Sequence, residues 1–566
     1  MTPPSRNNKS PDINPRLTMT RLIFTAACAA SLLLPGSAST QTSAATRLAR
    51  AASARVYQSH LEFLSNDLLE GRAPATRGGD LAALYIATQF RRLGLEPAGD
   101  SGSYFHQVPI IALSGTPRLV VRGPGAPALR LPEDYVLWSE RNDPQVTLRG
   151  WAVFVGYGID APENEWNDFA GTDVAGKVLL ILVNDPPAPA DEPDLFGGPA
   201  MTYYGRWTYK YEEAARQGAL GAIIVHETEP AGYPWSVVRG GWSGPQFDLP
   251  PDPSAATVGV LGWVSHEIAS QALALAGLDF AELKAAAAQR GFSAVPTGIT
   301  VDAALTSGIR RVETQNVVGL LPGASRPDEY ITMTSHYDHF GMGEVIDGDS
   351  IYNGAYDNAS GTALLMEIAQ SFTELPERPV RSILFIAIAA EEQGLLGAHW
   401  YAQSPLFPLN RTVAEINIDG ANLWGETDDV IAQGSERSGL GAFVQRRADQ
   451  MGLTIMPDAE PEKGFFFRSD HFPFALAGVP SLYIEHGRDF RGRPKGWGDE
   501  TMEVYTAVRY HAPSDEFSDE FVFDGAVQQG TLVLLTALDV ANDDSWPDWH
   551  EGQEFKAARD RMMTGN

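Results

Sequence analysis

Cysteine is almost absent from this sequence. Its 566 residues include one, Cys28, which stands in an apolar run near the N-terminus. If that run is a cleaved export signal, the mature chain has no thiol and no disulfide. We therefore expect a core that folds without covalent cross-links, and any metal site must use nitrogen and oxygen ligands.

Long apolar runs are absent too, because no segment beyond the N-terminal one reaches about 18 consecutive apolar residues. The N-terminal run, residues 22–34, follows Arg21 and precedes Gly36-Ser37-Ala38, a pattern that suits signal peptidase. We expect residues 1–38 to be a signal peptide and the mature protein to be periplasmic or secreted, without membrane insertion. The alternative is a lipid anchor on Cys28.

Positive charge is scarce. The sequence has 42 Lys and Arg against 71 Asp and Glu, for a formal net charge of −29. This balance argues against nucleic acid and anionic membranes as partners. An acidic surface promotes solubility, and it can also attract cations such as metal ions or a protonated peptide amine. The oligomeric state is not indicated by the sequence.

The first part of the chain has helical and extended patterns. Leu61, Leu64 and Leu68 have helical spacing, and two short strands are expected at Phe105–Ile111 and Leu119–Arg122. After Arg311 the chain alternates apolar strands with helices, which predicts an α/β fold with a mostly parallel central sheet flanked by helices. The strands are expected at Asn316–Leu321, Tyr330–Thr334, Ile383–Ala389, Val413–Ile418 and Val479–Ile484.

Histidines and carboxylates follow these strands, at the sheet edge where α/β proteins place their sites. The candidates are His336, Asp338, Asp357, Glu391, Glu392, Asp419 and His511, the last preceded by Tyr510. Two histidines with bridging and terminal carboxylates are ligands that a pair of zinc ions accepts. Two such ions can activate a shared water for hydrolysis.

Each motif also has a structural interpretation. His336 and Asp338 leave the same face of an extended segment, so Asp338 can accept a hydrogen bond from the imidazole, but any strand end could carry this pair. Glu391 and Glu392 repel one another unless a cation or a proton relieves them. An acidic pair before a helix can instead complement the helix dipole.

Six motifs occur in one order: Ser335-His336-Tyr337-Asp338-His339, Gly354 to Gly361, Ala390 to Gly397, Asn417-Ile418-Asp419, Ser469-Asp470-His471 and Tyr510-His511. With the segment Glu70-Gly71-Arg72, they resemble the M28-type co-catalytic zinc aminopeptidases, the aminopeptidase Y and Streptomyces aminopeptidase group. The resemblance spans residues 310–540. It implies a zinc exopeptidase fold and peptides as substrates.

The resemblance also implies a role for each site residue. Two Zn²⁺ ions per chain would be held by His336, Asp357, Glu392, Asp419 and His511, with Asp357 bridging. Glu391 would be the general base, Tyr510 would donate to the oxyanion, and the peptide bond after Asp357 would be cis. Two further roles come from the residues rather than from the resemblance: Asp338 is expected to support His336, and Arg468, beside Ser469-Asp470, is expected either to orient substrate or to form a surface salt bridge. One departure is Gly420, where many members carry Met.

A second resemblance concerns the segment between these parts. Gly156-Tyr157-Gly158, Asp173 to Lys177 and Gly218 to Ala222 resemble a protease-associated (PA) domain. This implies a β-rich insert that acts as a lid or positions substrate. We therefore expect a signal peptide (1–38), an N-terminal part of the peptidase domain (45–140), the PA domain (141–305), the zinc peptidase domain (306–545) and a C-terminal tail (546–566).

The predicted function is that of a secreted or periplasmic di-zinc aminopeptidase. One alternative is a glutamate carboxypeptidase-like exopeptidase, which shares the metal ligands, although that branch usually has Asp-Pro where this chain has Asp357-Asn358. The other is a receptor-like member of the fold without catalysis, against which the intact ligand set argues. Side-chain specificity and the native substrate are not predicted.

Overall fold

The structure is a computed structural model that describes residues 54–123, 125–141, 143–242, 245–251 and 256–565. The predicted signal peptide and Cys28 lie outside these residues. All described residues belong to one compact unit. Within them, no helix combines the length and the apolar character that a membrane span requires.

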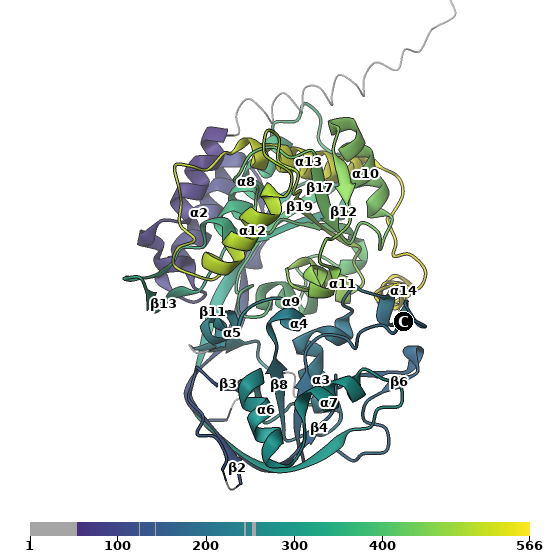
Figure 1. Ribbon diagram of the computed structural model, residues 1–566. Helices are drawn as coiled ribbons and strands as arrows, with labels where there is room; N and C mark the ends of the chain where they lie inside the picture. The colour runs from purple at the N-terminus through teal and green to yellow at the C-terminus, as the bar shows by residue number, and fades with distance from the viewer. Residues whose placement is uncertain (1–53, 124, 142, 243–244, 252–255, 566) are drawn as a thin grey trace, which may run out of the picture. The chain divides into compact units, whose positions relative to one another are not determined.

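A mixed sheet of 15 strands runs through the described part of the chain (Figure 1). Along its main path the strands are β18 (Thr454–Met456), β17 (Asp429–Gln433), β19 (Ser481–His486), β16 (Thr412–Asn417), β12 (Arg326–His336), β15 (Arg381–Ile388), β11 (Val295–Leu321), β4 (Gln145–Phe154), β7 (Val178–Leu182), β8 (Gly221–His226), β10 (Val260–Ser265) and β3 (Tyr135–Trp138). The neighbours β19, β16, β12 and β15 are parallel. The predicted mostly parallel core is therefore confirmed.

Helices cover both faces of this core. The strand β15 shows this, since its side chains are apolar on both faces and pack under helices on each. Its odd-numbered residues from Ile383 to Ala387 join the core that contains α2 (Arg77–Leu93), α8 (Gly361–Thr373) and α13 (Asp524–Asn542). Its even-numbered residues from Leu384 to Ile388 join the core under α9 (Leu396–Gln403) and α11 (His471–Leu476). A continuous apolar run is what a strand buried on both faces requires.

Two long antiparallel strands carry the chain from this core into the inserted segment. β2 (Phe105–Arg122) pairs with β11 along its whole length, from Phe105 opposite Val317 to Arg122 opposite Thr300. The expectation of two separate short strands was wrong, because pairing with β11 continues through the exposed residues Ser114 to Thr116. The two strands connect the peptidase part to the insert.

The insert is itself a layered α/β body. Its strands β4, β7, β8 and β10 are parallel neighbours. One face packs against α6 (His266–Leu275) and α7 (Phe280–Ala287), and the other against α3 (Trp207–Arg216) and α5 (Trp235–Trp242). The expected β-rich insert thus also has helices on both faces. β3 pairs with β10, although it precedes the predicted boundary at 140, and the domain boundaries stay predictions.

The N-terminal helical pattern ends earlier than expected. Residues 54–64 are helical, and Leu61 and Leu64 are fully buried. Leu68 lies instead in the 3-10 helix η1 (Asp67–Arg72) and is 84% exposed. The Asn66 side chain accepts from the Leu68 N–H and starts this new turn, which rotates Leu68 away from the core.

Candidate metal centre

The ends of three neighbouring strands supply most of the predicted ligands. His336 is the last residue of β12, Glu391 and Glu392 follow β15, and Asp419 follows β16. Since β12 lies between β15 and β16 and all three run parallel, these side chains meet at one edge of the sheet. The short π-helix η6 (Ala355–Ser360), which follows β14 (Asp349–Tyr352), adds Asp357.

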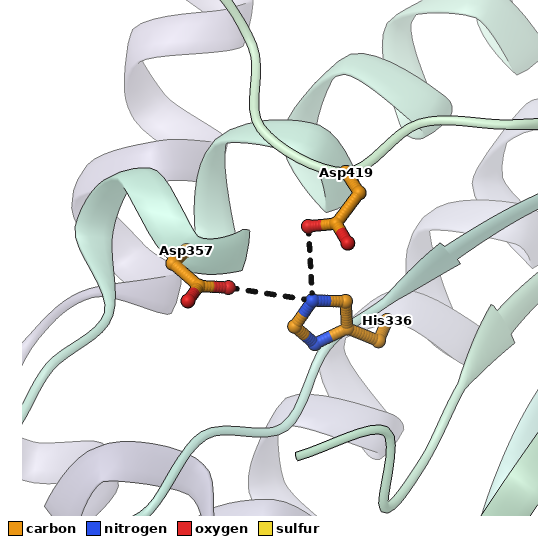
Figure 2. Close-up of side chains that lie close together, drawn as sticks. All are labelled: His336, Asp357 and Asp419. Carbon is orange, nitrogen blue, oxygen red and sulfur yellow. Dashed lines mark hydrogen bonds and ion pairs between the residues drawn. The ribbon is translucent and has the colours of Figure 1, made fainter. Parts of the chain in front are cut away.

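His336 is the centre of the first group of donors. Its Nε2 lies 3.2 Å from Asp419 Oδ1, 3.4 Å from Asp357 Oδ1 and 3.8 Å from Glu391 Oε2. Figure 2 shows the imidazole pointing between the two aspartates. Burial acts to lower the pKa of His336, but Glu391 and Asp419 outweigh it and hold that pKa well above its ordinary value.

His511 forms the second group, on the other oxygen of the same aspartate. Its Nε2 lies 3.3 Å from Asp357 Oδ2 and 3.2 Å from Glu392 Oε2. Although burial opposes it, the nearby Glu392 and Asp357 raise the pKa of His511 to about 10. Asp357 therefore stands between two histidines, with one carboxylate oxygen toward each.

His339 is a further donor, which the resemblance did not name among the ligands. Its Nδ1 lies 2.5 Å from Glu392 Oε1, and His339, Asp357 and Glu392 offer atoms within 4.8 Å of one another. Both oxygens of Glu392 thus contact an imidazole. His511 contacts Asp357 as well as Glu392, so we retain His511 as the candidate ligand and place His339 behind Glu392.

The charges at this edge fit bound cations. Four carboxylates lie around two imidazoles: those of Asp357, Glu391, Glu392 and Asp419. A group of carboxylates in a partly buried site is costly in free energy unless positive charge neutralises it. The buried arginine Arg72 donates to four backbone carbonyls, those of Leu64, Tyr337, Asn353 and Gly354. The remaining donors are imidazole nitrogens and carboxylate oxygens, which suit zinc.

Glu391 is held by its backbone next to the first group. Asp338 Oδ1 accepts a hydrogen bond of 3.1 Å from the Glu391 N–H. The same oxygen lies 3.9 Å from His336 Nδ1, which is longer than a hydrogen bond. In this structure Asp338 therefore positions Glu391 more directly than His336. Burial, reinforced by the negative charge of Glu392, raises the pKa of Glu391 well above its ordinary value despite the opposing effect of His336.

Tyr510 and Arg468 share a cavity of about 540 Å³ with Glu391, Glu392 and His511. The Tyr510 ring stacks on His511 with centroids 3.7 Å apart. Burial, together with the charges of Asp357 and Glu392, keeps the pKa of Tyr510 well above its usual value, so its hydroxyl stays protonated as a donor. The structure thus brings all the predicted site residues to one place.

Asp515 is a site residue that sequence reasoning missed. Its carboxylate accepts hydrogen bonds from the backbone N–H groups of Tyr356 and Asp357, each at 3.1 Å, and one of 3.2 Å from the Tyr505 hydroxyl. It therefore sets the backbone that carries the central aspartate. The only sequence signal is its position shortly after His511, on a segment already expected near the site.

Asn358 links two of the ligand segments. Its side chain donates to the Ile418 carbonyl at 3.1 Å and accepts from the Gly420 N–H at 2.8 Å, on either side of Asp419. The peptide bond between Asp357 and Asn358 is cis, which confirms the prediction. Asp419 is held further by Ser469, whose hydroxyl donates to its Oδ2.

The departure at Gly420 has a local explanation. Its φ is +81°, and a Cβ there would lie 2.8 Å from the ring of Tyr356, whose hydroxyl pairs with His486 Nε2 at 3.1 Å. A methionine would need both another backbone conformation and another position for Tyr356. Glycine at this position therefore belongs with the packing of Tyr356 and leaves Asp419 in place.

Comparison with known proteins finds a family match over part of the chain. Residues 316–532 match the profile of Peptidase family M28. A probable zinc metalloprotease of Leptosphaeria maculans is 33% identical over 261 residues, which cover 41% of this chain and 58% of that protein. Aminopeptidase YwaD of Bacillus subtilis is 27% identical over 240 residues, covering 41% and 46%. The chain thus spans about half the length of these curated relatives.

A comparison with solved structures finds an aminopeptidase from Aneurinibacillus sp. strain AM-1. The superposition has a TM-score of 0.47 at 18% identity and covers 89% of this chain and 97% of that one.

Proposed function

We propose that this protein is a zinc-dependent aminopeptidase, which removes N-terminal amino acids from peptides, because residues 316–532 match the profile of Peptidase family M28. The observation that carries this proposal is the position of Asp357 between His336 and His511, with one carboxylate oxygen facing each. That arrangement suits a carboxylate shared by two metal ions. The names of the relatives, zinc metalloprotease and aminopeptidase, agree with it.

The proposed ligand set divides into two halves around the shared aspartate. His336 and Asp419 would hold one ion, and Glu392 and His511 would hold the other. When bound, the pair of ions would polarise the scissile carbonyl and lower the pKa of a water molecule. The number of two metal ions per chain is thus part of the proposal.

The side chains of the chain supply the proton transfers. Glu391 Oε2 lies 3.8 Å from His336 Nε2 at the edge of the first group, and the Glu391 backbone is fixed by Asp338, so we assign the Glu391 carboxylate to accept a proton from the attacking water. The same carboxylate would pass the proton to the leaving amine. The Tyr510 hydroxyl would donate to the carbonyl oxygen as negative charge develops there. Glu391 and Asp419 would attract the free α-ammonium group of the substrate.

The test measures metal and activity on one preparation. We expect two metal ions per chain, loss of hydrolysis of amino-acid anilides after strong chelation, and recovery on addition of zinc. Full activity in a verified metal-free sample would exclude the proposal. Parallel assays on N-blocked dipeptides distinguish a carboxypeptidase, which cleaves these in preference to anilides. A receptor-like protein would cleave neither.

The place of action is a further part of the proposal. The predicted signal peptide, residues 1–38, supports a periplasmic or secreted enzyme, with a lipid anchor on Cys28 as the alternative. Mass determination of the mature N-terminus after expression with the full leader distinguishes the two, because cleavage after Ala38 removes Cys28.

A further inference from the structure

The two terminal carboxylates of the candidate metal centre each turn one oxygen toward a histidine ligand. Asp419 Oδ1 lies 3.2 Å from His336 Nε2. Glu392 Oε2 lies 3.2 Å from His511 Nε2. Asp357 differs, because it turns both of its oxygens toward histidines. The second oxygen of each terminal carboxylate is therefore available to accept a hydrogen bond from the protein.

Both of these second oxygens have a donor. The Ser469 hydroxyl donates to Asp419 Oδ2. His339 Nδ1 lies 2.5 Å from Glu392 Oε1. An ionised carboxylate only accepts hydrogen bonds, so the imidazole carries its proton on Nδ1 and donates it to Glu392. The two halves of the centre thus have the same plan, with one oxygen facing a histidine ligand and the other held by a donor of the protein.

Packing fixes the direction of the His339 ring independently of Glu392. His339 is 0% exposed, and its ring lies against Gly354, where a Cβ would come within 2.6 Å of the imidazole Cγ. The Arg72 guanidinium donates to the carbonyls of Gly354 and Tyr337, so it holds the backbone under the ring and the backbone that leads to it. His339 is therefore a donor that is oriented in advance for Glu392.

The next residue supports the other ligand of the same half. The Phe340 ring meets the His511 ring edge to face, with centroids 4.6 Å apart. The dipeptide His339-Phe340 thus contacts both Glu392 and His511, the two residues assigned to one ion. A change at His339 should therefore affect that ion in particular.

The contacts of His339 distinguish it from a ligand. Among the described residues, Glu392 is the only carboxylate with which His339 forms an ion pair, whereas His511 pairs with both Glu392 and Asp357. The other nitrogen of His339, Nε2, is buried and has no hydrogen-bond partner in the described part of the chain. His339 thus reaches the site through Nδ1 alone, and a nitrogen that donates its proton to Glu392 does not at the same time bind a metal ion.

We propose that His339 is a positioning residue for the second metal ion, because its hydrogen bond to Glu392 Oε1 keeps Oε2 as the oxygen that this ligand offers. The inference rests on the two-metal site proposed above and adds a residue that acts on one half of it. Hydrogen-bonding partners behind a metal ligand typically contribute about 10-fold to 100-fold in metal affinity. His339 contributes this much for one ion and little for the other.

Metal binding tests this role without measuring peptide turnover. Competition of the zinc-loaded protein with chelators of graded strength gives an affinity for each of the two ions. His339→Leu removes the donor, so we expect one ion to bind about 10-fold to 100-fold more weakly while the other keeps the parent affinity. Circular dichroism on the same samples separates weakened binding from unfolding.

Two amides at the same position give a matched comparison. The side-chain nitrogen of Asn is as many bonds from the backbone as Nδ1, whereas that of Gln is as many bonds away as Nε2. His339→Asn should therefore keep the hydrogen bond to Glu392 and most of the parent affinity. His339→Gln should bind one ion about as weakly as His339→Leu, and this pair of amides decides the question if the Leu variant does not fold.

The control is His226→Asn, the same change at a buried histidine of the insert, whose Nε2 contacts the Tyr233 carbonyl at 3.1 Å. It should bind both ions like the parent. The positioning role is excluded if His339→Gln binds both ions like the parent. It is equally excluded if His339→Asn loses an ion as fully as His339→Gln, since the imidazole itself would then be required, as it is for a ligand.

The same measurements separate this proposal from the peptidase proposal. A protein that holds two ions and cleaves no peptide would lose the proposed function, yet weaker binding of one ion by His339→Gln and its recovery in His339→Asn would keep the positioning role. Equal affinities in all variants of an active parent would do the reverse.

Discussion

The carboxylate of Asp515 accepts a hydrogen bond of 3.1 Å from the backbone N–H of Asp357. Asp357 is the residue that faces both His336 and His511, so the position of the candidate metal centre depends on a carboxylate that offers no ligand of its own. Burial raises the pKa of Asp515 to about 6, while the two backbone donors act in the opposite direction.

Asp515→Asn should therefore weaken metal binding without removing a ligand. The amide has one acceptor oxygen, so it cannot satisfy the N–H groups of Tyr356 and Asp357 together with the Tyr505 hydroxyl as a carboxylate does. We expect the metal affinity to fall by about 10-fold to 100-fold. Competition with a zinc chelator measures it. Asp519→Asn, at an exposed position of the same segment, is the control, and equal affinities in both variants would refute the positioning role.

Glu391 and Glu392 are neighbours in sequence, yet their Gln variants should fail in different ways. Glu391→Gln leaves all five candidate ligands, so it should keep both metals while kcat falls by about 10²-fold to 10⁴-fold. Glu392→Gln alters a group that contacts His511 and His339, so it should lose metal and recover partly with added zinc. Metal analysis and kinetics on the same samples show whether each variant has lost proton transfer or metal binding. Loss of metal from the first variant, or tight retention of both ions by the second, would show the two roles to be misassigned.

The insert should limit the length of peptide that reaches the site. The pairing of β2 with β11 suggests where to remove it, because Ser114 lies opposite Gly308. Replacing residues 115–307 with Asn-Gly closes the two strands as a hairpin with a two-residue turn. We expect the variant to keep metal and some anilide hydrolysis, with a smaller preference for short over long peptides.

Circular dichroism and metal content establish whether that shortened chain has folded. The rings of Phe467 and Phe472, which pack 6.4 Å and 5.3 Å from Tyr203 of the insert, become exposed in it, so some loss of stability is expected. A folded, metal-bound variant that discriminates more strongly against long peptides than the parent would contradict a limiting role for the insert.

Glu367 should make the stability of the fold depend on pH. Burial raises its pKa from 4.5 to about 8, and its Oε1 lies 3.7 Å from His60 Nε2 with no hydrogen bond to any described residue. Between these two pKa values the folded protein keeps a proton that the unfolded chain loses. The contribution of Glu367 to the free energy of unfolding is therefore complete below pH 4.5 and falls as the pH rises to 8. Burial lowers the pKa of His60 from 6.5 to about 4. Between these two pH values His60 makes the stability rise with pH, which opposes the effect of Glu367.

The clearest window is therefore between about pH 6.5 and pH 8. There, the unfolding free energy of Glu367→Gln relative to the parent should increase by up to about 1.4 kcal/mol per pH unit. Urea denaturation at several pH values measures the difference. Glu374→Gln, the same change at an exposed position at the end of the same helix, should show no such trend. A flat difference for Glu367→Gln would mean that this carboxyl is already ionised in the folded state.

The parts of the fold that the sequence predicted are those with a local signal. β12, β15 and β16 are apolar runs, and such runs pair in parallel only when helices cover both faces. His336, Glu392 and Asp419 follow these runs directly, so the direction of the strands was enough to bring the side chains together. The sequence therefore determined the layered core and the identity of the candidate ligands.

Only the tertiary structure decided which distant side chains hold that centre in place. Arg72 reaches the carbonyls of Tyr337 and Gly354, and Asp515 reaches the backbone of Asp357, across long stretches of chain. No pattern of residues specifies such a contact, because it depends on how separate loops pack. The pairing of Ser114 to Thr116 with β11 likewise depends on tertiary structure, since these exposed residues have no apolar pattern that predicts a strand.

The meeting of Arg206 with Arg468 is the decisive case. From the sequence, only Arg468 was expected near the substrate, and Arg206 carried no such signal. Packing of the insert against the loop that carries Arg468 places both in one cavity, where neither Nε finds an acceptor in the described residues. The sequence thus determined the candidate metal ligands, whereas the docking of the insert decided what surrounds the substrate, because that docking depends on long-range contacts rather than on local pattern.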